Sequence, residues 1–149
     1  MSIELNDISD VATAIAAVIA AISLGVSAFQ TRLSRRIAET AFEDSIDQQY
    51  RELAKEIPVD VLIDRCTEVN SDTREVIFNY LDLCNQQVYL RAKGRISDDR
   101  WVDWCDGIQE NLVKSAFLSV WTEVQDKASF SYLNRLENES FKSDPLRWK

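Results

Sequence analysis

The feature that most constrains this chain is an uncharged run of 19 residues, Val11 to Phe29, near its N-terminus. At about 1.5 Å per residue, a helix of this length reaches ~28 Å, close to the ~30 Å hydrocarbon core of a bilayer. The run therefore predicts one transmembrane helix over residues 11–33, preceded by a short extracytoplasmic tail over residues 1–10. Residues 34–149 are then expected to form a cytoplasmic helical domain.

The charges on the two sides of the run predict its orientation. Three acidic residues and no Lys or Arg precede it, whereas Arg32, Arg35 and Arg36 follow it closely. Because cytoplasmic flanks carry the excess of positive residues, the N-terminus is expected outside and the C-terminal domain in the cytoplasm. The predicted location is the bacterial inner membrane, where these three arginines would anchor the helix at the interface and contact anionic membrane lipids.

Two other interpretations of the run stay open. A cleaved signal peptide would need a basic region before the apolar run, but that region is acidic here. A buried helix of a soluble helical bundle is compatible with the many alanines, which make the run only marginally apolar.

The distribution of side chains around this helix predicts self-association. At about 100° per residue, the large apolar side chains fall within one arc of roughly 100°, and most other positions are small or hydroxylated. In lipid, small residues favour helix association because they let backbones approach closely. The predicted oligomer-interface or pore-lining residues are Thr13, Ala16, Ala17, Ala20, Ala21, Ser23, Gly25 and Ser27. A plain alanine-rich anchor is the alternative, and the spacing does not decide whether the hydroxyl groups pack or face water.

Composition restricts the chemistry of the chain. It contains no histidine, which removes His-based catalytic arrangements and the usual zinc sites. Its net charge of −8 argues against nucleic-acid binding by a general basic surface. Cys66, Cys84 and Cys105 show no C-x-x-C spacing and are expected to be reduced and packed as small apolar groups. No catalytic residue, metal site or cofactor is predicted, and the chain is not expected to be an enzyme.

The residues after the run predict further helices, because only three glycines and two prolines interrupt the whole chain. Neither residue type occurs from Val26 to Ile57, so the transmembrane helix is expected to continue as a long amphipathic helix that Pro58 ends. Glu39, Glu43 and Asp47 are predicted to form a solvated face of it, with an acidic vestibule in a ring of protomers as the alternative. Residues 59–63 fit either a strand or a helical turn.

Capping residues mark the later helices. Asp72, with Glu75 three positions on, predicts a helix start, and Gly94 predicts the end of that helix. Ser97 predicts the start of the next helix. Further helices are expected over residues 115–127 and 130–136, and the tail over residues 141–149 is expected to dock through its aromatic side chains. The predicted fold class is all-α, with the transmembrane helix followed by a small helical bundle.

One row of carboxylates could carry a binding function. Asp99, Asp103, Asp106 and Glu110 step by four, three and four residues and share an arc of about 60° on a helix. Neighbouring carboxylates repel each other, so the row could bind a divalent cation or a basic partner. The alternative is a water-exposed acidic face on an acidic protein.

The second half of the chain carries a recognisable pattern. It comprises the stretch from Tyr80 to Ser97, then Trp101-x-x-Trp104-x-x-Gly107-Ile108, then Phe117 and Trp121. This pattern resembles an uncharacterised family of short bacterial membrane proteins that combine one N-terminal span with a small cytoplasmic helical domain. The resemblance covers roughly residues 42–148 and implies a packing core, with no catalytic residue carried across.

The overall layout is also similar to that of a CRISPR-associated accessory protein that assembles into a membrane pore. The Arg-x4-His pattern of that protein is missing here. We therefore expect a self-associating membrane effector that perturbs or permeates the inner membrane, in antiviral defence. The alternative is a membrane-tethered adaptor whose helical domain binds a cytoplasmic protein partner.

Overall fold

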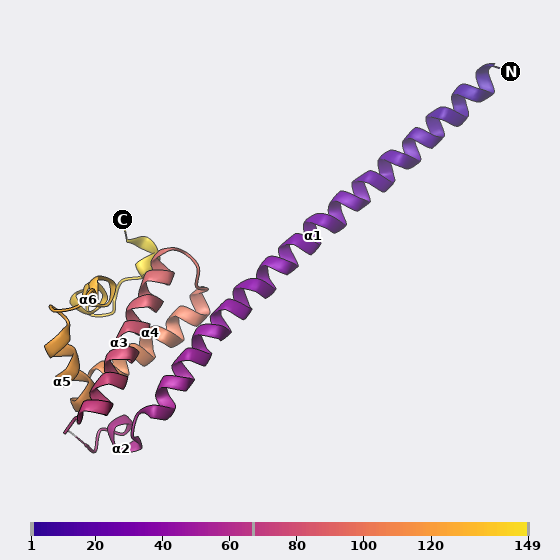
Figure 1. The fold of residues 1–149 in the computed structure, drawn as a ribbon. Helices are drawn as coiled ribbons and strands as arrows, with labels where there is room; N and C mark the ends of the chain where they lie inside the picture. The colour runs from indigo at the N-terminus through magenta and orange to yellow at the C-terminus, as the bar shows by residue number, and fades with distance from the viewer. Residues whose placement is uncertain (1, 67, 149) are drawn as a thin grey trace. The chain divides into compact units, whose positions relative to one another are not determined.

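The computed structural model describes residues 2–66 and 68–148, with side chains described from residue 10 onward. The described residues form helices and no strand, which confirms the predicted all-α class. The elements (Figure 1) are α1 (Ser2–Glu56), α2 (Val59–Leu62), α3 (Ser71–Ala92), α4 (Asp98–Leu112), α5 (Ser115–Val124), α6 (Ser131–Asn138) and the 3-10 helix η1 (Pro145–Arg147).

The chain divides into two compact units, Met1–Ala41 and Phe42–Lys149. The first unit contains the N-terminal part of α1, and the second contains the rest of α1 with all later elements. The limits predicted for the tail, the transmembrane helix and the cytoplasmic domain stay predictions.

Helix α1 is continuous through the apolar run and the amphipathic stretch that follows, as predicted. Within the described residues it is the one helix long and apolar enough to cross a membrane, with a mean hydropathy of 2.2 over its most apolar window. The helix ends before Pro58, since proline lacks the N–H group and restricts the residue before it. Residues 59–62 form a helical turn rather than a strand.

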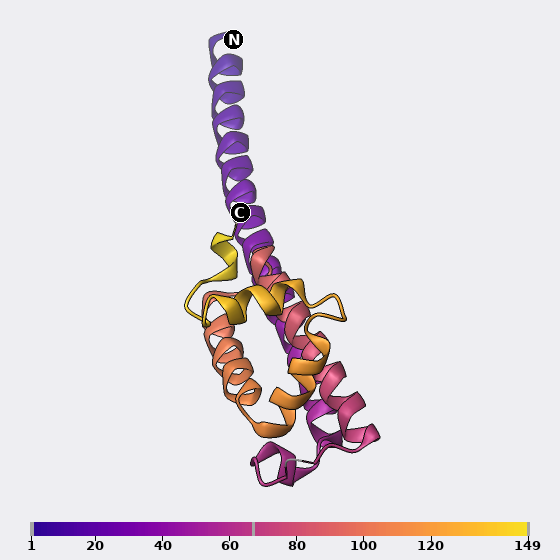
Figure 2. The ribbon, with the colours of Figure 1, turned by 90° about the vertical axis from the view of Figure 1, so that its left-hand side faces the viewer.

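The core of the second unit forms where α3 packs against α5, α6 and η1, while α4 packs against α3 and α5. Helix α6 is seen end-on in Figure 1 and lengthwise, crosswise to α3, in Figure 2. The apolar faces of α3, α4 and α5 are buried. Edge-to-face aromatic pairs join Tyr80 to Phe117 and Trp121 to Phe130, with ring centroids 5.2 and 5.7 Å apart.

The helix ends agree with the predicted caps except at the start of α3. There the N-cap is Asn70, whose side chain accepts the Thr73 N–H at 2.8 Å, so the predicted N-cap at Asp72 is wrong. The earlier start buries Thr73 and places Asp72 in the first turn, where the helix dipole favours an acidic side chain. Gly94, at a φ of +67°, follows the end of α3, and Ser97 caps α4 as predicted.

The C-terminal tail docks through its aromatic residues, as predicted. Phe141 and Trp148 pack against the core, and Pro145 is buried in η1. The guanidinium of Arg135 lies 4.5 Å from the centroid of the Trp148 ring, which also stacks on Tyr132. The tail therefore belongs to the packed part of the second unit.

Candidate functional site

The apolar run in the first unit is exposed along its whole length. Its large aliphatic and aromatic side chains, from Val11 to Phe29, have exposed fractions of 50–73%. None of the most apolar window of α1 is buried. Transfer of one such side chain from water to an apolar environment is worth about 1.5–3 kcal/mol, so exposure of these side chains to water is unfavourable.

The small residues predicted as an interface are all exposed on the same helix. The hydroxyl of Ser23 donates to the Ile19 carbonyl at 2.8 Å, and that of Thr31 donates to the Ser27 carbonyl at 2.9 Å. A Cβ added at Gly25 would meet no atom within 4 Å. Packing within the chain therefore gives no reason for this glycine, which costs a helix about 1 kcal/mol relative to alanine.

The three arginines after the run, Arg32, Arg35 and Arg36, are exposed. Arg35 donates from Nε to Glu39 at 3.0 Å, one turn along the helix. Such an exposed pair contributes about 0.3–0.5 kcal/mol at most, so Arg35 is not held in place by it.

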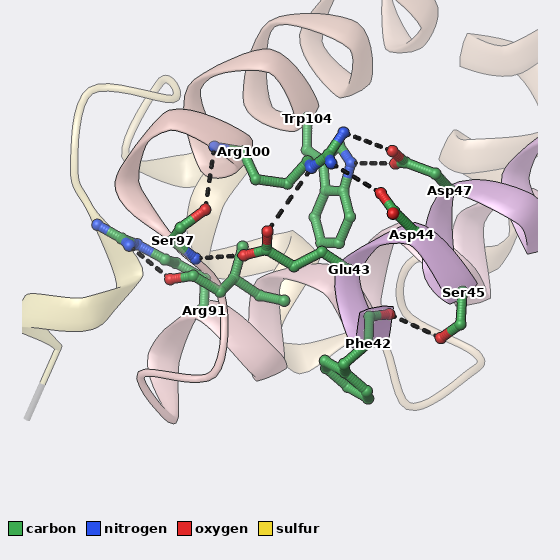
Figure 3. Close-up of polar contacts among 10 residues, drawn as sticks. Phe42, Glu43, Asp44, Ser45, Asp47, Arg91, Ser97, Arg100 and Trp104 are labelled. Atoms are coloured by element: carbon green, nitrogen blue, oxygen red, sulfur yellow. Dashed lines mark hydrogen bonds and ion pairs between the residues drawn. The ribbon is translucent and has the colours of Figure 1, made fainter. Parts of the chain in front are cut away.

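The second unit contains a group of charged side chains that we call the Arg100 cluster: Glu43, Asp44 and Asp47 of α1 with Ser97, Arg100 and Trp104 of α4 (Figure 3). Arg100 donates to Asp47 at 2.6 Å and to Asp44 at 3.0 Å. The Trp104 indole donates to the second oxygen of Asp47 at 2.7 Å.

Glu43 is the most buried carboxylate of the Arg100 cluster, with 6% of the residue exposed. It accepts the Ser97 N–H at 2.6 Å, at the N-terminus of α4, where the helix dipole favours negative charge. The predicted solvated face is therefore wrong for Glu43 and Asp47, because α4 covers them and supplies their donors. Glu39 remains exposed.

A second ion pair, with a buried guanidinium, joins α3 to the C-terminal tail. Arg91 is 3% exposed and donates from Nε to Asp144 at 2.8 Å and from Nη1 to the Ile96 carbonyl at 2.9 Å. Its hydrogen bond with Asp144 raises the pKa of Arg91 and lowers that of Asp144. Asp98 approaches the same guanidinium at 2.6 Å. The partners lie up to 53 residues apart, and sequence reasoning did not find them.

The predicted acidic row lies on the exposed side of α4, where Asp99, Asp103, Asp106 and Glu110 face solvent. In the part of the chain that the structure describes, no three or more acidic or thiol side chains come together to hold a metal ion. The row forms a negatively charged, solvent-exposed surface on α4.

The cysteines differ in accessibility. Cys84 is fully buried, and this burial raises the pKa of its thiol to about 12. Cys105 is half-buried, and burial raises its pKa to about 11. Burial thus suppresses the thiolate form that a nucleophilic cysteine needs. The chain matches none of the known protein families, curated proteins or solved structures with which it was compared.

Proposed function

We propose that this protein is a self-associating membrane effector. Residues 11–33 span the bacterial inner membrane once, with the N-terminus outside and residues 34–149 forming a cytoplasmic helical bundle. The small-residue face of α1 mediates assembly, and the assembly perturbs or permeates the membrane in antiviral defence. The protein belongs with the short single-pass bacterial membrane proteins that its sequence resembles, and it is not an enzyme.

The observation that carries this proposal is the exposed apolar run. A helix with exposed side chains from Val11 to Phe29 is stable in lipid, where apolar surface costs nothing and the helix satisfies its own backbone groups. The hydroxyls of Ser23 and Thr31 bond to carbonyls of the same helix, which reduces the cost of placing them in hydrocarbon.

Gly25 supports self-association through the small-residue face. The glycine is unexplained by packing within the chain, but it would let the backbone of a second copy approach closely. Ala21, one turn earlier, lies on the same face. A larger side chain substituted at either position would therefore separate the α1 helices of neighbouring copies.

The Arg100 cluster supports a mechanical link between assembly and the cytoplasmic domain. It ties residues 43–47 of α1 to α4 through a buried carboxylate and a shared guanidinium. Rotation of this part of α1 against α4 would break these bonds. Rearrangement of α1 on assembly would therefore act on the domain as a whole.

The test of assembly is the mass of the detergent-extracted protein beside a shortened chain beginning at Ser34. We expect a discrete full-length oligomer and a monomeric shortened chain. Ala21→Leu with Gly25→Leu should reduce the oligomer to monomer, because bulky side chains hold the backbones apart. Val18→Leu with Ile22→Leu is the matched control on the bulky arc and should leave the mass unchanged. A full-length monomer would contradict self-association.

Permeation is tested separately with dye-loaded liposomes of anionic bacterial lipids. Leakage should require the full-length protein and disappear with the Ala21→Leu, Gly25→Leu variant. An oligomer that never causes leakage would remove permeation and leave assembly standing.

The alternative function is a membrane-tethered adaptor, and the exposed acidic row on α4 favours it. Four like charges on one face, with the exposed Val102 also on α4, suit a basic cytoplasmic protein partner. Charge reversal of Asp99, Asp103, Asp106 and Glu110 should then release a partner that purifies with the protein in fixed stoichiometry. A partner that stays bound would contradict this role of the row.

A further inference from the structure

A pocket of about 220 Å³ lies within the second unit, between the C-terminal part of α1, α3 and α4. Three aromatic side chains, Tyr50, Tyr80 and Trp104, form part of its wall. The Asn111 amide donates to the Tyr80 hydroxyl at 2.9 Å at one end of the pocket. The pocket is independent of the small-residue face of α1.

Gln87 is the unusual residue of this wall. It is only 5% exposed, yet its side-chain amide has no hydrogen-bond partner among the described residues. Every fully buried side-chain nitrogen or oxygen in the described chain has a hydrogen-bond partner. The unpaired Gln87 amide is therefore not fully buried, and it contacts open space. Since Gln87 lines the pocket, that space is the pocket. A ligand that enters the pocket could therefore form a hydrogen bond with this amide, which both donates and accepts.

Asp103 places a negative charge in the wall of the same pocket as Gln87. The turn over residues 93–97 reverses the chain between α3 and α4, and Tyr80 contacts Asn111. Gln87 on α3 and Trp104 on α4 both line the pocket. Asp103 precedes Trp104, and its carboxylate forms no ion pair or hydrogen bond within the described chain.

The charges around the pocket favour a cation. Its described lining contains no Lys or Arg. Two cations beside it are already engaged, since Arg100 binds Asp47 and Lys114 binds the Asn111 carbonyl oxygen at 2.7 Å. Aromatic faces attract cations, and a carboxylate accepts charge-assisted hydrogen bonds. An anion would meet the carboxylates of Asp47 and Asp103 and no cationic side chain among the described lining residues.

We propose that this pocket binds an organic cation, an alkylammonium or alkylguanidinium group. The charged head lies against Asp103 and the Gln87 amide oxygen, and the aliphatic stem lies between Tyr50, Tyr80 and Trp104. The volume is below the ~300–1,000 Å³ of drug-sized sites, so it admits one slender group of this type. The cation is either a free amine or the Lys or Arg side chain of a protein.

The test is a titration of the full-length protein in detergent, followed by the indole N–H resonance of Trp104. The free cations are butylammonium and butylguanidinium, and the side-chain probes are acetyl-Gly-Lys-Gly-amide and acetyl-Gly-Arg-Gly-amide. Butanol and the norleucine peptide are the neutral controls. We expect saturable shifts with at least one cation and none with the neutral probes.

Asp103→Asn should weaken cation binding about tenfold, because it removes a charge-assisted hydrogen bond. Asp106→Asn, the same change three residues along α4 outside the pocket, should change it less than about twofold. Gln87→Leu should weaken binding without lowering Tm, because it removes no hydrogen bond of the free protein.

Each outcome decides the proposal. Tighter binding of a free cation identifies a small molecule as the source, and binding of a charged peptide alone identifies a protein side chain. Absence of binding, equal binding of neutral probes, or equal weakening by Asp103→Asn and Asp106→Asn would overturn it. None of these results depends on oligomerisation or leakage.

Discussion

Large apolar side chains are exposed in the first unit of this protein and mostly buried in the second. Leu24 in the first unit is 73% exposed, whereas Leu81 in the second is fully buried. The eight large apolar side chains between Val11 and Phe29 are all exposed, whereas most of those of α3 and α5 lie in the core. Apolar content alone therefore does not specify burial. The second unit buries most of its large apolar side chains, and the first leaves its own exposed.

Hydrogen bonding sharpens this contrast. In the first unit, Ser23 and Ser27 take part in bonds that span four residues of one helix. In the second unit, Glu43 and Arg91 bind partners more than 50 residues away. The first unit can thus form its polar contacts in any environment that permits a helix, while those of the second require the tertiary fold.

The largest expected effect is a matched pair of Leu→Ala substitutions. Leu81→Ala should lower the free energy of unfolding by about 2–5 kcal/mol through lost burial and a cavity. Leu24→Ala should change it by less than about 0.5 kcal/mol. All four tryptophans, at positions 101, 104, 121 and 148, lie in the second unit, so their fluorescence in urea reports on that unit. Equal losses would mean that Leu24 packs in the same core.

The next effect concerns the buried Arg91. Asp144→Asn should cost about 2 kcal/mol at neutral pH, because the guanidinium is left in a buried site without its main counter-charge. Asp98→Asn removes a carboxylate that is 84% exposed from the same guanidinium and should cost less than about 1 kcal/mol.

The pH dependence follows from the lowered pKa of Asp144. The contribution of the ionised Asp144 to the free energy of unfolding is present above the ordinary pKa of 3.8. It is lost as the pH falls through the lower pKa of the folded state. The gap in stability between the wild type and Asp144→Asn should therefore be constant near neutrality and shrink below about pH 4. A gap that grows on acidification would refute this assignment.

Two glutamates on α1 compare a buried with an exposed carboxylate. Glu43→Gln should destabilise the second unit by about 1–2 kcal/mol, since it weakens a charge-assisted bond to the Ser97 N–H at the start of α4. Glu39→Gln, four residues earlier, should change stability by less than about 0.5 kcal/mol. The measurement is urea unfolding of both variants, and a larger loss for Glu39→Gln would reverse the assignment.

The smallest perturbation is chemical labelling of the native cysteines. Cys84 should be the slowest to react with iodoacetamide at pH 8, because it is fully buried and its pKa is about 12. Cys66, half-exposed and on a loop, should react first. Mass spectrometry of the labelled protein gives the order, and urea should equalise the rates. Rapid labelling of Cys84 in the native state would indicate local opening of α3.

Much of the helical architecture could be predicted because its determinants are local. The cap at Ser97, the positive φ at Gly94 and the stop at Pro58 act within one turn of the chain. The start of α3 differs from the prediction because Asn70 and Asp72 both suit an N-cap, and it is the Asn70 side chain that accepts the Thr73 N–H.

The candidate sites also divide into features that depend on local sequence and features that depend on tertiary contacts. The small-residue face of α1 and the acidic row of α4 follow from helical periodicity, so the sequence by itself determined which residues share each face. The burial of Glu43, the Arg91–Asp144 pair and the pocket beside Gln87 depend on which distant helix supplies a donor or a wall. Helical periodicity repeats every few residues, whereas desolvation of a charge requires atoms from segments far apart, so only the tertiary structure decided these features.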